Sequence, residues 1–193
     1  MIMNPIAQFF PLPAHDRQTV KRTQQQYRMK RQPFRYYLVT DLEATCEENN
    51  TNYRNEIIEF PLVLIEVDQR QQLNIIDHTQ IYVKPTINPV LSDFCKNLTG
   101  ISQDQVNCAE TLDTVLVKIH DWLVSKNLIV GTYDEWTSGN QKGAPFAFIT
   151  DGPYDLYKFL HAECEEKKIT KPCYYSNWVN IRRVFGDHYK SNA

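Results

Sequence analysis

Two carboxylates one residue apart, Asp41 and Glu43, follow a short apolar run in the string YYLVTDLEATCEE. If Tyr36 to Thr45 form a strand, alternate side chains share a face, so both carboxylates point the same way at the end of a buried element. Each carboxylate disfavours ionisation of the other unless a cation or a hydrogen-bond donor is close. The pair therefore suggests a metal site. A strand end that passes into an acidic loop is an open alternative, because two further glutamates follow directly.

A second pair of carboxylates lies in the string DGPYDLYKFL, which follows the apolar run Phe146 to Thr150. Strands of an open α/β sheet deliver functional groups at their ends, so Asp151 and Asp155 lie where a ligand site is expected. The alternative is that either aspartate caps the N-terminus of the following helix. For Asp151 we favour the capping role.

The elements that carry these residues are an antiparallel meander and a later parallel strand. Alternating and β-branched residues predict strands over Tyr36 to Thr45, Glu56 to Asp68, and Ile75 to Val83, joined by short polar loops. Pro61 is expected near the start of the second strand, where a missing N–H is tolerated. The run Phe146 to Thr150 predicts a central strand that pairs in parallel after a helical crossover.

Helical spacing is clearest from Glu110 to Lys126, where apolar residues form one stripe. Other helices are expected over Pro89 to Leu98, from Ser102, from about Tyr154 through Cys164, and near Tyr174 to Phe185. The last of these would place Trp178, Ile181 and Val184 on one face. The glycine-rich segment Gly131 to Pro145 is predicted to be an exposed loop or an insertion.

Composition indicates one acidic domain that follows a basic segment. The 193 residues, of which 42% are hydrophobic, suffice for one domain with a sizeable core. Residues 1–40 contain seven basic residues and one acidic residue, whereas residues 41–193 contain 14 basic and 22 acidic residues. We expect a basic, flexible tail over residues 1–35 and a globular domain over residues 36–193. The tail would contact phosphate backbone, act as a localisation signal, or only extend the chain.

The five cysteines form no CxxC pair and are odd in number, so we expect reduced and mostly buried thiols. No apolar run approaches the ~20 residues of a membrane helix. Residues 1–16 lack the basic start and the long apolar stretch of a signal peptide. These observations predict an intracellular protein, cytoplasmic or nuclear, that does not contact a membrane.

Four strings, in this order and at these distances, resemble one nuclease family: DLEATCEE, NEIIEFPLVLIEV, LSDFCKNLTGISQDQV and ITDGPYDLYKFL. Residues 36–190 are similar to the ERI-like branch of the DEDDh exonuclease superfamily, the branch of histone-mRNA and small-RNA 3′ exoribonucleases. The resemblance implies an α/β, RNase H-like fold with a mixed central sheet flanked by helices. It also implies a 3′-to-5′ exonuclease that releases nucleoside monophosphates with two Mg²⁺ or Mn²⁺ ions.

The resemblance also implies roles for individual residues. Asp41 and Glu43 match the first acidic pair of the family, and Asp155 matches the aspartate of the second motif. All three would be catalytic metal ligands, with Glu43 touching both ions. Further residues are implied near the last nucleotides of the substrate: Ala44, Thr45, Leu98, Thr99, Gly100 and Ile101. From the residues alone, the string LTGI can equally be the C-terminal cap of a helix.

This sequence departs from the family pattern in its third motif, a histidine general base followed about five residues later by an aspartate. After Asp155 the sequence has His161 and His188, and neither is followed by such an aspartate. Two alternatives stay open: a metal-dependent exonuclease that is weakly active or shortened, and an inactive RNA-binding or protein-interaction module that keeps the fold. The nucleic-acid partner expected by resemblance is single-stranded or 3′-overhanging RNA.

Overall fold

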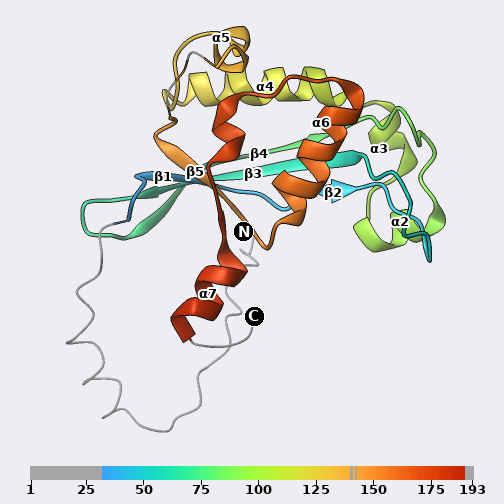
Figure 1. The fold of residues 1–193 in the computed structure, drawn as a ribbon, viewed down its shortest axis with the longest axis horizontal. Helices are drawn as coiled ribbons and strands as arrows, with labels where there is room; N and C mark the ends of the chain where they lie inside the picture. The colour runs from blue at the N-terminus through green and yellow to red at the C-terminus, as the bar shows by residue number, and fades with distance from the viewer. Residues whose placement is uncertain (1–31, 140, 142, 190–193) are drawn as a thin grey trace, which may run out of the picture. The chain divides into compact units, whose positions relative to one another are not determined.

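The structure is a computed structural model that describes residues 32–139, 141 and 143–189 (Figure 1). The tail predicted over residues 1–35 thus lies outside the described residues, except for residues 32–35. Within this short stretch, Arg35 pairs with Glu66 at 2.6 Å and the ring of Phe34 packs edge-on against Tyr37. Residues 32–35 therefore belong to the globular body, which starts at Gln32.

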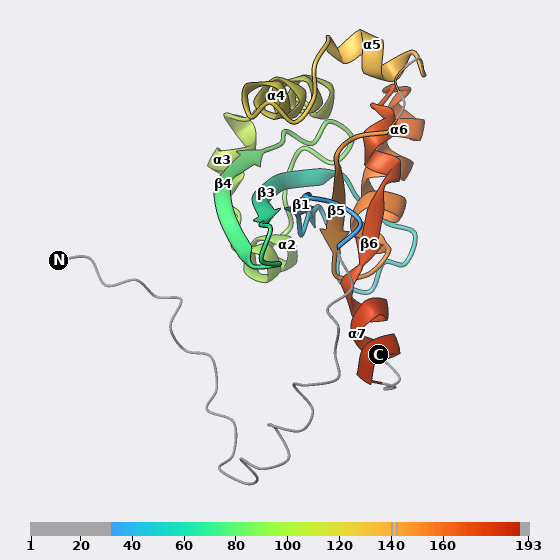
Figure 2. The same ribbon diagram turned by 90° about the vertical axis from the view of Figure 1, so that its left-hand side faces the viewer.

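A mixed sheet forms the centre of the body (Figure 1, Figure 2). Its order is β2 (Glu43–Ala44), β3 (Ile57–Val67), β1 (Tyr36–Val39), β5 (Phe146–Thr150) and β6 (Trp178–Asn180), and β4 (Leu73–Tyr82) also pairs with β3. Strands β1, β2 and β4 are antiparallel to β3, whereas β5 is parallel to β1 and β6 is parallel to β5. The predicted meander and the predicted parallel strand are both confirmed.

The single strand predicted over Tyr36 to Thr45 is interrupted, and β1 and β2 are its two parts. Strand β1 and Glu43 of β2 pair with β3 in one register, which places Asp41 opposite Pro61, and the register shifts between Glu43 and Ala44. Pro61 lies in the interior of β3 and not near its start, and its carbonyl accepts a hydrogen bond from the Thr40 hydroxyl at 2.7 Å. Because proline has no N–H, it cannot complete the ladder on this edge. The interruption therefore falls at the first candidate carboxylate.

Three helices cover one face of the sheet: α4 (Leu112–Ser125), α5 (Tyr133–Thr137) and α6 (His161–Lys167). Helix α7 (Ile181–Tyr189) lies on the other side (Figure 1, Figure 2). The predicted stripe of α4 packs into the core, where Leu116 and Ile119 are fully buried. Helices α2 (Asp93–Thr99) and α3 (Gln103–Asn107) are capped by the hydroxyls of Ser92 and Ser102. The predicted helix start at Ser102 is confirmed.

The glycine-rich segment Gly131 to Pro145 is mostly exposed, as predicted, but the prediction of a loop or insertion is wrong for Tyr133–Thr137. It contains helix α5, which begins with a capping box at Thr132. The side chain of Trp136 on this helix is 4% exposed and donates a hydrogen bond to the Val130 carbonyl at 2.8 Å. One aromatic residue therefore anchors a segment whose composition is typical of a loop.

The helix predicted near Tyr174 to Phe185 is also wrong in its first half. A 3₁₀ turn over Cys173–Ser176 is followed by strand β6, and α7 begins only at Ile181. Trp178 therefore lies on a strand, where it pairs with Phe148 of β5. A short apolar run fits the period of a strand or a helix equally well, and here the neighbouring strand decides.

All five cysteines are free thiols, as predicted, but only Cys95 and Cys164 are buried. The prediction that most of the thiols are buried is therefore wrong. Within the described ranges, no helix is long and apolar enough to cross a membrane.

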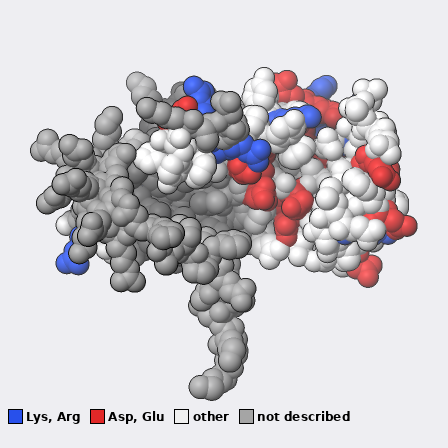
Figure 3. Space-filling view, turned by 90° about the horizontal axis from the view of Figure 1, so that it is seen from below, with Lys and Arg blue, Asp and Glu red and all other residues white. Residues whose placement is uncertain are grey.

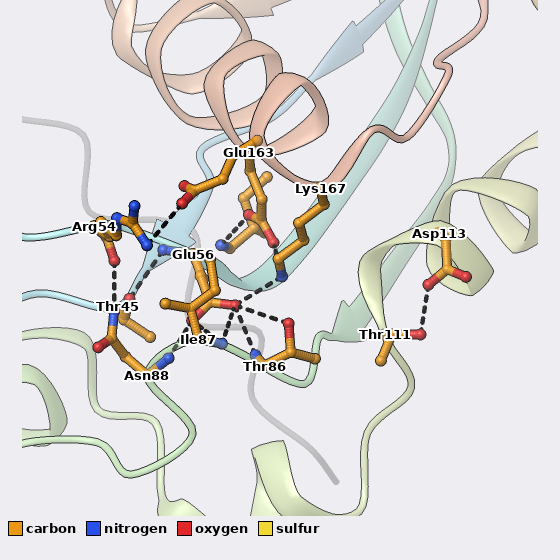
Figure 4. Close-up of polar contacts among 12 residues, drawn as sticks. Thr45, Arg54, Glu56, Thr86, Ile87, Asn88, Thr111, Asp113, Glu163 and Lys167 are labelled. Atoms are coloured by element: carbon orange, nitrogen blue, oxygen red, sulfur yellow. Dashed lines mark hydrogen bonds and ion pairs between the residues drawn. The ribbon is translucent and has the colours of Figure 1, made fainter.

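A lysine between two buried glutamates joins α6 to the sheet (Figure 4). The Nζ of Lys167 lies 2.7 Å from Glu56 and 2.7 Å from Glu163, and both glutamate side chains are 1% exposed. Glu163 also accepts a hydrogen bond from the N–H of Ile57 at 2.6 Å. The remaining lone pairs of Glu56 are satisfied by the backbone N–H groups of Thr86, Ile87 and Asn88. This lysine cluster ties together α6, the start of β3 and the loop after β4.

Replacing Lys167 with methionine removes the only cation of the lysine cluster. We expect Lys167→Met to lower the free energy of unfolding by about 3–5 kcal/mol, because two buried carboxylates lose their partner. Urea denaturation at neutral pH measures this change. The control is Lys118→Met, which breaks a largely exposed pair with Glu110 and should cost less than about 1 kcal/mol. Equal losses in the two variants would contradict the role of Lys167.

The pH dependence of stability should depend on Glu56. Burial by itself raises the pKa of Glu56, but hydrogen bonds from Lys167 and three backbone N–H groups outweigh burial and hold the pKa below its ordinary value of 4.5. Because the pKa of Glu56 is lowered in the folded protein, the ionised side chain stabilises the fold fully above about pH 4.5. This stabilisation is lost as the pH falls through the lowered pKa. Urea denaturation at several pH values should therefore show a shallower acid loss for Glu56→Gln than for the wild type. An unchanged slope contradicts this assignment.

Candidate active site

Side chains alternate along the interrupted strand. Thr40 and Leu42 are buried, whereas Asp41 is exposed and Glu43 is half-buried. Leu42 packs in the core with Leu38, on the side of the sheet that α4 covers. Because successive side chains on a strand point to opposite faces, Asp41 and Glu43 face the other side of the sheet, where α7 lies.

Asp155 reaches the same place from the end of β5. It lies in a π-helix, η1 (Tyr154–Leu160), which continues directly into α6. Its side chain is buried, and its Oδ1 accepts a hydrogen bond from the N–H of Leu42 at 2.8 Å. Two residues earlier, the N–H of Thr40 donates to the carbonyl of Ile149 on β5 at 3.0 Å. The Asp155 side chain thus accepts the N–H of Leu42 at a position where β5 has ended and offers no backbone carbonyl.

The three carboxylates are close enough to affect one another electrostatically. Burial raises the pKa of Glu43, and the negative charges of Asp41, Glu59 and Asp155 raise it further. Burial also raises the pKa of Asp155, against the hydrogen bond from Leu42, and the charge of Asp41 adds to the increase. Both carboxylates are therefore harder to ionise than usual, and a cation among them would relieve this cost.

The donor set suits a hard divalent cation, because Mg²⁺ and Mn²⁺ prefer carboxylate oxygens. Within the part of the chain that the structure describes, no group of three or more acidic, histidine or cysteine side chains is already arranged to hold a metal ion. Asp155 is held by the N–H of Leu42, whereas Asp41 is exposed. Binding of a cation would then draw the Asp41 side chain toward the other two carboxylates.

The capping role that we favoured for Asp151 is wrong. The residue before η1 is Pro153, and no side-chain cap is present there. Asp151 instead forms two hydrogen bonds with Arg182 at the start of α7, at 3.0 and 2.7 Å. The sequence offered no local signal for this pair, because its partner lies on a different element.

The residues expected near the substrate by resemblance lie beside Glu43 and on α2. Ala44 is buried, and the Thr45 hydroxyl accepts a hydrogen bond from the N–H of Glu56 at 2.9 Å. Gly100 ends α2 with a φ of 73°, so the helix-cap alternative holds for this residue. The other members of this string differ in exposure: Leu98 is exposed, Thr99 is half-buried and Ile101 is buried. Their contacts with a substrate stay predictions.

Two groups beside the carboxylates were missed by the sequence analysis. Glu59 lies directly opposite Glu43 in the ladder and adds to the negative charge there. Tyr154, next to Asp155, is 54% exposed, and the Nζ of Lys158 lies 4.7 Å from its ring centroid. An aromatic residue adjacent to a motif aspartate was visible in the sequence, but its exposure was not.

The two histidines after Asp155 have other neighbours. His161 on α6 contacts Lys171 at 3.1 Å and lies 3.8 Å from Glu165. His188 lies on α7, with its ring edge-on to Tyr189. We assign neither histidine a role in the carboxylate site.

A mixed sheet with carboxylates gathered beside a strand interruption and at the end of a parallel strand defines a nuclease domain of the RNase H-like class. Comparison with protein-family models supports this class: the Exonuclease (RNase_T) model matches residues 38–191. The chain belongs to the RNase_T exonuclease family. Members of this family depend on metal ions, so the general prediction of a metal cofactor is confirmed.

Similar proteins place the chain in the branch expected from its motifs. It is 42% identical to human 3'-5' exoribonuclease 1 over 156 aligned residues. The alignment covers 80% of this chain and 40% of the human protein. It is also similar to the solved nuclease domain of 3'hExo, a DEDDh family member bound to rAMP, with 40% identity and a TM-score of 0.68 over 82% of this chain and 72% of that one. A solved structure that shows 3'-end specific recognition of the histone mRNA stem-loop by a 3'-exonuclease is 39% identical, with a TM-score of 0.67. The match covers 81% of this chain and 64% of that one. The chain spans less than half the length of the human relative.

The two functions of Asp155, as an acceptor and as a charge, can be separated by substitution. Asp155→Ala leaves the buried N–H of Leu42 without an acceptor and should lower the free energy of unfolding by about 1–3 kcal/mol. Asp155→Asn keeps an acceptor and removes a charge that burial disfavours, so it should be at least as stable as the wild type when metal is absent. Urea denaturation in EDTA measures both variants. Equal losses would show that the Leu42 hydrogen bond does not matter.

Proposed function

We propose that this chain is a metal-dependent 3′-to-5′ exonuclease domain that acts on RNA and releases nucleoside monophosphates. The observation that carries the proposal is the convergence of Asp41, Glu43 and Asp155 beside the strand interruption of an RNase_T fold. The choice of RNA is supported by the names of the relatives, one an exoribonuclease, one bound to rAMP and one recognising an mRNA stem-loop. Single-stranded or 3′-overhanging RNA presents the free 3′ end that such a reaction requires.

In this proposal Asp41, Glu43 and Asp155 would hold two Mg²⁺ ions, or Mn²⁺ in their place. When bound, such ions activate a water molecule and stabilise the leaving 3′ oxygen. The chain itself positions the ligands: β3 holds Glu43 through the ladder, and the N–H of Leu42 holds the carboxylate of Asp155. The exposed ring of Tyr154 offers a surface on which a base can stack.

The 3′-terminal nucleotide would lie beside β2 and α2, against Ala44, Thr45, Thr99, Gly100 and Ile101. We further propose that the domain works in the cytoplasm or the nucleus, where its five free thiols stay reduced.

Removing a metal ligand should strongly reduce nuclease activity. We expect Asp41→Asn and Glu43→Gln to slow Mg²⁺-dependent release of nucleotides by about 100-fold or more, because the electrostatic contribution of a metal ion is worth several kcal/mol and about 1.4 kcal/mol is a factor of ten. The measurement follows a single-stranded RNA labelled at its 5′ end, which an exonuclease acting from the 3′ end shortens stepwise.

The matched control is Glu110→Gln, which removes an exposed carboxylate from a surface pair with Lys118. This variant should cleave at the rate of the wild type. An RNA with a blocked 3′ end should resist degradation. RNA binding without any cleavage by the wild type would refute the proposed activity and would favour an RNA-binding module with the same fold.

A further inference from the structure

Arg182 connects α7 to the strand end that leads to Asp155. Its Nε donates to Oδ1 of Asp151 at 3.0 Å, and its Nη2 donates to Oδ2 at 2.7 Å. Two parallel hydrogen bonds fix the plane of the guanidinium group, which a single contact does not do. They engage one edge of the fork and leave the N–H donors of Nη1 outside the pair. The side chain is 58% exposed, so these donors are accessible from solvent.

The pair lies close to the carboxylate site. Asp151 directly follows β5, and its charge contributes to the raised pKa of Asp155. Helix α7 starts beside the loop between β5 and η1 and lies on the side of the sheet that Asp41 and Glu43 face (Figure 1, Figure 2). A cationic group is therefore held at the edge of a group of carboxylates.

Charge explains why a fixed cation matters at this edge. Acidic side chains are spread over the described part of the face in Figure 3, and groups of basic side chains lie beside some of them. A polyanion that enters this face is repelled unless a cation offsets the charge of a phosphate close to the site. The neighbouring Arg183 is less constrained, since its Nε lies 3.9 Å from Asp187 and its side chain is 81% exposed.

We propose that Arg182 binds a backbone phosphate of the RNA whose 3′ end lies at the carboxylate site. Asp151 is then a positioning residue, which orients the guanidinium group through the bidentate pair and does not itself touch the RNA. The proposal rests on the proposed function for the identity of the polyanion. It does not require that the chain complete a catalytic cycle.

The test measures binding of a single-stranded RNA with a 5′ fluorescent label by anisotropy, in EDTA and at several salt concentrations. We expect Arg182→Ala to weaken binding about tenfold, as for one charged hydrogen-bonded contact, and to reduce the slope of log affinity against log salt by about 0.7. Arg182→Lys keeps the charge and loses the fork, so it should keep the salt slope and lose part of the affinity. The matched control Arg183→Ala should change the affinity less than Arg182→Ala.

The variant Asp151→Asn distinguishes the positioning of Arg182 by Asp151 from the effect of the Asp151 charge on RNA binding. Removal of a negative charge by itself strengthens the binding of a polyanion, whereas loss of the bidentate pair releases Arg182. We expect weaker binding, with a smaller loss than for Arg182→Ala. Stronger binding by Asp151→Asn, or equal affinities of Arg182→Ala and Arg183→Ala, overturns the proposal. Urea denaturation identifies any variant that fails to fold, and Arg182→Lys and Asp151→Asn then carry the test.

The binding assay in EDTA keeps this proposal separate from the proposed function. If the wild-type chain does not cleave RNA but Arg182→Ala loses affinity as described, the phosphate contact stands and the nuclease activity fails. If the wild type cleaves RNA and Arg182→Ala binds as well as Arg183→Ala, the nuclease activity stands and the phosphate contact fails.

Discussion

The position of the candidate site depends on Lys167, which forms ion pairs with two glutamates inside the body. Backbone N–H groups satisfy the other lone pairs of these glutamates, so the buried charges are paired and hydrogen-bonded. Glu56 directly precedes β3, and Glu163 belongs to α6, which is continuous with η1. The lysine cluster therefore fixes one end of the helical segment whose other end carries Asp155.

At that other end, the carboxylates lie where the ladder with β3 is interrupted and β5 ends. Pro61 prevents the ladder from closing at Asp41, and β5 ends before it can accept the N–H of Leu42. Asp155 then takes the place of a backbone carbonyl. Acidic side chains rarely gather beside a core strand, because they repel one another. Here the N–H of Leu42, which has no acceptor on β5, holds Asp155 there.

Local patterns predicted the strands of the meander, the stripe of α4 and the cap at Ser102, because each depends on residues close in sequence. The pair Asp41 and Glu43 was visible as a possible site from its spacing, whereas the matching role of Asp155 came from the resemblance of its motif. Long-range contacts had no such signal. Lys167 lies in the charged string EEKK, and its side chain is only 15% exposed because Glu56, more than a hundred positions earlier, approaches it. The same reason explains Asp151, whose partner on α7 lies 31 residues later.

The π-helix η1 changes the angle around the helix axis between two carboxylates that bond to the sheet, Asp155 and Glu163. Asp155 bonds to Leu42 and Glu163 bonds to Ile57, so both carboxylates face the sheet although they are eight residues apart. In a regular α-helix, residues eight apart differ by roughly 80° around the axis, whereas wider turns rotate less per residue and bring them toward one face. Loss of one residue from η1 would restore ordinary helical winding and turn one of these carboxylates away from the sheet. This segment can therefore change its residue types more freely than its length.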